Sequence, residues 1–156
     1  IYFSVYGPYE SAKGRYANVV TQFLWDMKRG VRPILFGDGT QSRDFIHVND
    51  VVHENFLAAE SECSGKIINA GTGTETTMKN AIGILNRHMK TELKPQYIAN
   101  PVEGYCHRTL ADMTKAKDTI GFTPEITLEE GLASLMKFYE ENPKLLRTID
   151  FYRDAK

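Results

Sequence analysis

The chain has 156 residues, of which 42% are hydrophobic and 25% charged, and 19 basic against 20 acidic side chains give a formal net charge of −1. This composition is typical of a globular domain that buries a core without disulfides or metals. It excludes the basic footprint of a nucleic-acid binder, and no apolar run reaches the roughly 18 residues of a membrane span. Cys63 and Cys106 lack metal or redox spacing, so we expect free thiols in a reducing, cytoplasmic compartment.

The first predicted strand covers residues 1–5, an apolar run of β-branched and aromatic residues that Gly7-Pro8 ends. Because the chain begins inside this run without a methionine, we expect further sequence upstream. The polar stretch 9–16 predicts a loop. Residues 17–28 carry apolar side chains at spacings of three and four, which predicts an amphipathic helix that Gly30 ends.

The next predicted elements surround a glycine turn. Residues 33–36 predict a short apolar strand, 37–40 a tight turn and 43–48 a second strand. A helix is predicted over residues 51–60, with one member of the pair Asn49-Asp50 as its N-cap.

The middle of the chain continues the alternation. Residues 66–70 predict a buried strand, and Thr76-Thr77 opens a predicted helix that runs to Met89. Residues 96–99 and 108–111 are candidate short strands.

The last third of the chain is predicted to be mostly helical. Asp112 should cap a helix over residues 115–120, which Gly121 ends. Thr127-Leu128-Glu129-Glu130 has the form of a capping box and opens a helix to about Asn142, and Pro143 begins a last helical segment. Strands and helices alternate along the chain, so the predicted fold class is α/β.

Two signals for chemistry are weak. Gly71-Thr72-Gly73 lies between a predicted strand and a helix, as a dinucleotide-binding loop does, but Thr76 stands where the third glycine belongs. This favours a structural turn. Cys106-His107 favours a loop cysteine beside a solvated histidine, because adjacent residues of an extended segment point to opposite sides. Metal-ligand spacing is absent from the four histidines His47, His53, His88 and His107.

The strongest signal lies in residues 37–52, where a glycine turn, a guanidinium and an aromatic ring follow the apolar triplet Ile34-Leu35-Phe36. The triplet offers a flat surface to a nucleotide base, and Arg43 offers forked donors to a diphosphate. Phe45 shares a strand face with Arg43. The residues alone leave open whether Arg43 binds a diphosphate or pairs with an internal carboxylate.

Residues 37–52 resemble the GDGxQxRDFxxVxDVV signature of nucleotide-sugar epimerases and dehydratases, a group of extended short-chain dehydrogenase/reductases. Other segments resemble that family in the same order. Residues 2–8 are similar to its RYFNVYGP segment, 68–73 to NxGxG, 109–124 to the TxAD, SKA and LGFxP pieces, and 128–132 to the start of its final helix. The series covers nearly the whole chain and is more specific for the superfamily than for its UDP-glucose 4-epimerase branch.

The resemblance implies that residues 1–156 correspond to the C-terminal half of such an enzyme. Strands near residues 1–6 and 66–70 would be the last strands of a Rossmann-type parallel sheet, and the remainder would form the smaller substrate-binding subdomain. In this family the Gly-rich cofactor loop and the catalytic Tyr-x-x-x-Lys pair lie upstream of the segment similar to residues 2–8. We therefore expect NAD to be bound mainly by the other half, no catalytic residue in this chain, and no activity of this chain alone.

The resemblance also implies roles for individual residues. Phe3 would lie beside the nicotinamide of NAD, and Ser4 stands where the family usually has a diphosphate-binding asparagine. Arg43 would clamp the diphosphate. The implied substrate-binding residues are Ser4, Asn18 and Val19 near the diphosphate, Ile34, Leu35 and Phe36 around the base, Arg43, and Phe45 near the nucleotide.

One segment departs from the family pattern. Many members carry Arg-x-Gly-Asp before TxAD, whereas this chain reads Val102-Glu103-Gly104-Tyr105. Arg108 and Tyr105 are candidates to replace part of that function, although neither position matches the motif.

The implied activity is that of an NAD-dependent UDP-glucose/UDP-galactose 4-epimerase, which oxidises the sugar at C4, lets it turn and reduces it again. The expected partner is a UDP-sugar or related nucleotide-sugar, without nucleic acid or membrane, and the complete enzyme could be a homodimer. The alternatives are a dehydratase or decarboxylase of the same superfamily, and a non-catalytic remnant that binds a nucleotide or a partner protein.

Overall fold

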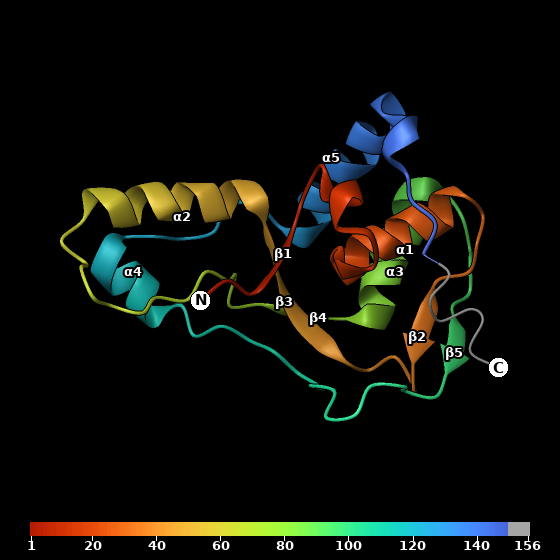
Figure 1. Ribbon diagram of the computed structural model, residues 1–156, viewed down its shortest axis with the longest axis horizontal. Helices are drawn as coiled ribbons and strands as arrows, with labels where there is room; N and C mark the ends of the chain where they lie inside the picture. Colours follow the sequence, from red (N-terminus) through yellow and green to blue (C-terminus); the bar gives the residue numbers. More distant parts are fainter. Residues whose placement is uncertain (150–156) are drawn as a thin grey trace.

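The computed structural model describes residues 1–149 and places two groups of helices at opposite ends of a central pair of strands (Figure 1). The central strands are β1 (Ser4–Tyr6) and β3 (Ser42–His47). The helical lobe consists of α1 (Val19–Lys28), α3 (Met78–Met89), α5 (Leu128–Glu141), β2 (Ile34–Phe36) and β5 (Gln96–Ile98). The narrow lobe consists of α2 (Val48–Glu60), α4 (Thr114–Ile120), the loop 61–73 and the loops on both sides of α4 within residues 111–126.

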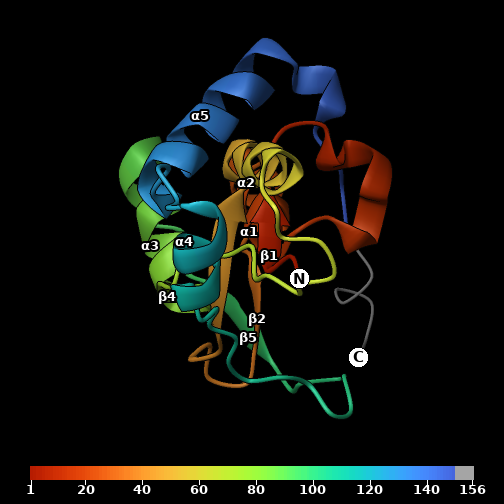
Figure 2. The ribbon, with the colours of Figure 1, turned by 90° about the vertical axis from the view of Figure 1, so that its left-hand side faces the viewer.

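Two small sheets give the molecule its α/β architecture. β1 pairs with β3 in parallel, with Ser4 opposite Phe45, and β3 pairs antiparallel with β4 (Glu75–Thr77), so this sheet is mixed. β2 and β5 form a separate parallel pair. Figure 2 shows α2 and α4 stacked in front of the central strands, where the two helices contact each other. No helix in the described part of the chain is both long and apolar enough to cross a bilayer.

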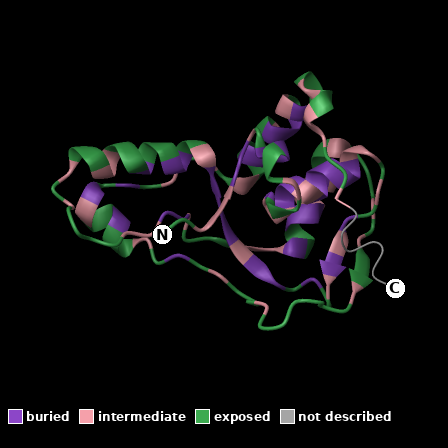
Figure 3. Ribbon diagram, viewed as in Figure 1, coloured by how far each residue is buried: buried purple, intermediate pink, exposed green. Residues whose placement is uncertain are grey.

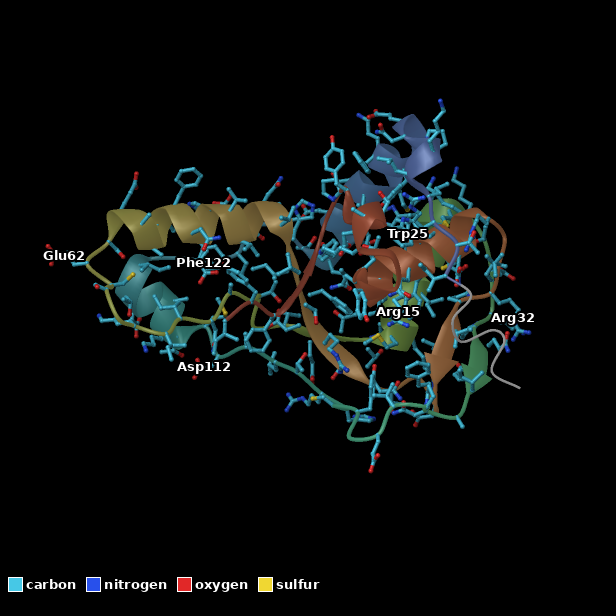
Figure 4. All side chains as sticks on the ribbon, in the orientation of Figure 1. Arg15, Trp25, Arg32, Glu62, Asp112 and Phe122 are labelled. Atoms are coloured by element: carbon cyan, nitrogen blue, oxygen red, sulfur yellow. The ribbon has the colours of Figure 1, made fainter. Side chains whose placement is uncertain are left out.

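The two lobes have separate hydrophobic cores. Apolar side chains of α1, α3 and α5 form the larger one, in which Trp25 meets Tyr139 edge to face at 5.9 Å. The smaller core lies between α2 and α4 around Ile46 and Phe122. Figure 3 shows the buried side of α2 facing this core and its outer side exposed, and Figure 4 labels Trp25 and Phe122 in the two cores.

Buried carboxylates connect loops to the central strands. Asp44 of β3 is fully buried and accepts hydrogen bonds from the backbone N–H groups of Thr72, Gly73 and Ala111 at 2.8–3.1 Å, and from the Thr72 hydroxyl at 2.6 Å. Asp50 similarly accepts from the N–H groups of residues 125 and 126. These bonds fix the two loops to the central strands and satisfy the buried N–H of Ala111.

The predicted helix starts are largely confirmed, because their capping residues are present. Asn18, Thr77 and Thr127 accept hydrogen bonds from the first turns of α1, α3 and α5, and Thr127 and Glu130 form the full capping box. The hydrogen bond from the Thr127 side chain lowers the pKa of the Glu130 carboxyl. Gly121 ends α4 with a φ of 68°, which a glycine adopts without strain.

Five local predictions are wrong, the last of them the cap of α4. Residues 66–70 do not form a strand, because Lys66 and Ile67 face solvent and only Ala70 bridges to Tyr2. Residues 108–111 form only one bridge, from Arg108 to Ser42. The stretch predicted as a loop contains a 3-10 helix, η1 (Glu10–Tyr16).

The fourth error concerns the cap of α2. The helix begins at Val48, so the pair Asn49-Asp50 lies inside its first turn. Instead, the Nδ1 atom of His47 accepts the hydrogen bond from Asn49 N at 3.3 Å. The Asp50 carboxylate is directed away to the loop amides described above. For α4, Met113 holds the cap position, while Asp112 accepts from Thr114 N at 2.9 Å, which lowers the pKa of Asp112.

Candidate functional site

A cavity of about 210 Å³ lies between α1 and β2. Four of the predicted substrate-binding residues line it, namely Val19, Ile34, Leu35 and Phe36. Val19 is the first residue of α1, and β2 presents the other three along one short strand. Leu35 is almost fully buried in the core, so Ile34 and Phe36 supply the more exposed surface. The apolar triplet and the start of α1 thus form one wall of this cavity.

Arg43 approaches this wall from β3 through Tyr105. Its guanidinium donates to the carbonyl oxygens of Ser42 and Cys106 at 2.7 and 2.6 Å, and to that of His107 at 3.3 Å. The guanidinium carbon lies 5.0 Å from the centre of the Tyr105 ring, and that ring packs edge to face on Phe36 at 5.7 Å. Within residues 1–149 Arg43 therefore bonds to carbonyl groups, and pairing with an internal carboxylate is not observed.

Tyr105 and Arg108, the two candidates for the departing segment, lie in different places. Tyr105 lines the 210 Å³ cavity beside Phe36. Arg108 instead pairs with Glu75 of β4, with Nε and Oε2 2.5 Å apart. This hydrogen bond is the largest cause that lowers the pKa of Glu75. The structure thus brings Tyr105, and not Arg108, to the cavity wall next to Arg43.

Ser4, Asn18 and Phe45 surround the ends of β1 and β3. Ser4 and Phe45 are paired in register, and the Asn18 amide donates to the carbonyl of Val5 at 3.0 Å. The Asn18 oxygen also caps α1, so this side chain fixes the helix start against β1. Phe45 is buried and lines a second, larger cavity of about 700 Å³ beside residues 111–128. Four predicted substrate-binding residues, Ser4, Asn18, Arg43 and Phe45, are therefore not among those that line the 210 Å³ cavity.

Phe3 can offer only a hydrophobic contact to a cofactor. Its ring is half-buried, and its backbone N–H donates to the carbonyl of Ala70 at 2.9 Å. This fits the apolar face of a nicotinamide. The loop Gly71-Thr72-Gly73 is not suited to bind a pyrophosphate. The backbone N–H groups of Thr72 and Gly73, which a pyrophosphate would need as donors, already donate to Asp44.

Gly71 has a packing function. A Cβ atom at this position would lie 2.4 Å from the Cβ of Ala111 and 3.0 Å from Oδ2 of Asp44. Only glycine allows the two segments to approach this closely. This contact supports the interpretation of Gly71-Thr72-Gly73 as a structural turn.

A Tyr-x-x-x-Lys spacing, which we did not expect in this chain, occurs at Tyr9 and Lys13. The Tyr9 ring packs edge to face on Phe138 at 4.9 Å, and the Lys13 ammonium bonds to Glu10 at 3.0 Å. The two side chains therefore serve packing and pairing contacts. A second such spacing, Tyr152 to Lys156, lies outside the described residues.

The histidine and cysteine signals have structural explanations. His47 is buried, caps α2 and contacts the ring of Tyr6 at 5.3 Å, and burial lowers its pKa. Cys63 and Cys106 are free thiols, and Cys106 bonds to the Arg108 carbonyl. His107 contacts the Thr40 hydroxyl at 3.3 Å. Among the residues that the structure describes, no group of three His, Cys, Asp or Glu side chains could hold a metal.

Sequence reasoning missed several cavity-lining residues. Gln41 braces β2, because its amide donates to the Phe36 carbonyl at 2.8 Å. Its presence in the signature segment was a usable signal, whereas no motif pointed to Arg15. The missed lining residues are Arg15, Gln22, Phe23, Asp26, Gln41, Met78 and Ile149.

Comparison with known proteins identifies the class. The family profile "NAD dependent epimerase/dehydratase family" matches residues 1–71. The crystal structure of a Thermotoga maritima UDP-glucose 4-epimerase with UDP-glucose is 35% identical and superposes with a TM-score of 0.84, over 91% of this chain and 45% of that one. The chain therefore belongs to the NAD-dependent epimerase/dehydratase family and is similar to UDP-glucose 4-epimerases.

Curated relatives differ in the sugar they act on. A UDP-glucuronate 4-epimerase of Thermodesulfobacterium geofontis is 34% identical over 95% of this chain and 44% of its own length. A UDP-N-acetyl-alpha-D-glucosaminuronate decarboxylase of Bacillus cytotoxicus is 29% identical over 90% of this chain and 45% of its own. The chain thus spans somewhat less than half the length of these relatives.

Proposed function

We propose that this chain forms the sugar-nucleotide-binding part of an NAD-dependent nucleotide-sugar 4-epimerase that interconverts UDP-glucose and UDP-galactose. The observation that carries the proposal is the cavity wall of Val19 and Ile34–Phe36, with Arg43 held against it through Tyr105. An apolar strand and a forked cation in this arrangement suit a base joined to a diphosphate.

We propose that the two ends of the molecule have different functions in the complete protein. The residues just before β1 pair in parallel with the segment that ends at Ala70, through Tyr2, which supports the assignment of both segments to a Rossmann-type sheet. The helical lobe, with the cavity, corresponds to the substrate-binding subdomain. NAD, when bound, accepts and returns the hydride of the sugar, and in this chain Phe3 is the residue proposed to contact it.

For this chain the proposed contribution is positioning. A nucleotide held by its base and diphosphate leaves the sugar able to turn, and this use of remote binding energy serves the reaction at C4. We expect the 156-residue chain alone to show no turnover with NAD and a UDP-hexose, because residues 1–156 do not include the Gly-rich cofactor loop of the family.

The function is tested with the complete native protein and Arg43→Ala. A charge-assisted contact contributes roughly 1.5–3 kcal/mol, so the variant should bind UDP about tenfold to a hundredfold more weakly in calorimetry. Arg87→Ala, which removes an exposed arginine of α3 that pairs with Glu129 of α5 and does not line the cavity, is the control. Unchanged UDP affinity in Arg43→Ala would remove Arg43 from the site, and absence of UDP-hexose interconversion would reject the epimerase.

The second candidate is a decarboxylase of the same family. It is favoured by the similarity to the Bacillus cytotoxicus enzyme. Incubating the complete protein with a UDP-uronate and measuring released carbon dioxide separates the two reactions.

A further inference from the structure

The cavity beside β2 carries one basic side chain that the family resemblance does not assign. Arg15, from the 3-10 helix η1, lines the same wall as Val19, Phe36 and Tyr105. Among the described lining residues the other charged side chain is Asp26, whose carboxylate pairs with Arg29 at 2.7 Å. Arg15 is thus the basic side chain among the described residues that line this cavity.

The backbone around Arg15 is held in place by specific contacts. Gly14 turns the chain with φ 53° and ψ −125°, a conformation open to glycine. The Gln22 amide, which lines the cavity, donates to the carbonyls of Arg15 at 3.2 Å and Ala17 at 2.7 Å. Arg15 is therefore tied to α1, and Figure 4 shows it beside this helix.

The Arg15 guanidinium also has a local support. It donates to the Tyr16 hydroxyl at 2.8 Å and lies 4.9 Å from the centre of that ring. Lys13, two residues earlier in η1, differs because its ammonium bonds to the buried Glu10 and it does not line the cavity. Of these two basic residues of η1, Arg15 is the one that lines the cavity.

We propose that Arg15 is a further substrate-binding residue, which contacts the phosphate groups of the nucleoside diphosphate. The proposal rests on the proposed function, which places the base on Ile34–Phe36. A nucleotide in that position directs its phosphates past Val19 at the start of α1, four residues from Arg15 in the chain. A guanidinium forms bidentate bonds to phosphate oxygens, and Arg15 and Arg43 then bind the diphosphate together.

The test measures the affinity of the complete native protein for uridine, UMP and UDP by calorimetry. Arg15→Ala should weaken UDP binding about tenfold and leave uridine binding unchanged, since uridine has no phosphate. Arg15→Lys keeps the positive charge but loses the forked pair of donors, so its affinity for UDP should lie between those of the wild type and Arg15→Ala. Lys13→Ala makes the same change in net charge in the same helix and should leave UDP affinity unchanged. Thermal melting checks that each variant is folded.

The outcomes separate this inference from the proposed function. Wild-type UDP affinity in Arg15→Ala would overturn the role of Arg15 while the epimerase assignment stands. An equal loss for uridine would show that Arg15 contacts the base, which also overturns the phosphate contact. Equal losses in Arg15→Ala and Lys13→Ala would indicate a general charge effect and would overturn it as well. A wild-type protein that binds neither UDP nor a UDP-sugar would defeat both proposals.

Discussion

The helical lobe buries Trp25, Tyr139 and a continuous group of aliphatic side chains between three helices, whereas the narrow lobe encloses a much smaller cluster around Ile46 and Phe122. In the narrow lobe, loops are instead tied to the central strands by the carboxylates of Asp44 and Asp50. Apolar packing tolerates small adjustments, but a buried carboxylate requires each of its donors in place. The candidate cavity belongs to the lobe with the larger core, where apolar side chains pack behind its wall.

The largest effect should come from removing the carboxylate of Asp44. Asp44→Ala leaves three backbone N–H groups without their acceptor, and the buried N–H of Ala111 alone costs about 1–3 kcal/mol when it is unsatisfied. We expect a loss of about 3 kcal/mol or more in the free energy of unfolding, measured by urea titration. Asp118→Ala, an exposed aspartate on α4, should change it by less than about 0.5 kcal/mol. A loss no larger than this control would refute the importance of Asp44 for the narrow lobe.

A second effect concerns Glu54 on α2, and depends on pH. Its side chain is buried, one oxygen lacks a described partner, and burial raises its pKa to about 7. The folded state thus holds this proton more tightly than the unfolded chain, whose carboxyl titrates near 4.3. The free energy of unfolding should therefore fall as pH rises from about 4 through about 7, by about 2–3 kcal/mol from this group.

Glu54→Gln isolates this contribution. The variant should lose the fall in stability between about pH 4 and pH 8, and at pH 8 it should be more stable than the wild type. His47, whose lowered pKa acts in the opposite direction by removing stability below about 6.5, is present in both proteins and cancels in the difference. Parallel stability curves for the two proteins would contradict the burial of an ionisable Glu54.

The smallest effect tests the packing of the helical lobe. A Cβ atom on Gly131 of α5 would lie 1.9 Å from the Tyr6 hydroxyl oxygen, so Gly131→Ala should lower the melting temperature through a loss of about 2 kcal/mol. Tyr6→Phe in the same chain should recover part of it, because the Tyr6 hydroxyl lacks a described partner. Gly83→Ala in α3, where the new methyl meets no atom within 4 Å, should instead gain about 0.5–1 kcal/mol. Equal effects at both glycines would rule out the close contact.

Helix caps and turns were predictable because their signals are local. Thr127 and Glu130 form their capping box within four residues. The cap of α2 by His47 was not predictable, because histidine is an uncommon cap and its ring is held by burial against Tyr6. Residues 66–70 failed for a similar reason: an apolar run becomes a strand only when a neighbouring strand pairs with it, and only Ala70 finds one.

The candidate site was likewise predictable only in part. The resemblance pointed to Val19 and Ile34–Phe36, which the structure places in one cavity. It could not show that Arg43 would be held by the carbonyls of residues 106 and 107, or that Tyr105 would lie between Arg43 and Phe36, because these contacts join segments more than 60 residues apart.

The six consecutive residues of strand β3 make contacts on which several different parts of the molecule depend. Ser42–His47 supplies an inter-strand bond, the candidate phosphate ligand, a loop anchor and a helix cap, and the neighbours Phe45 and Ile46 enter the two different cores. A saturation mutagenesis library should therefore show its narrowest mutational tolerance along this strand, while the adjacent turn at Asp38 accepts more replacements. Evolution of new sugar specificity in such a scaffold would have to proceed around β3, through the surrounding loops and helix starts, and not through the strand itself.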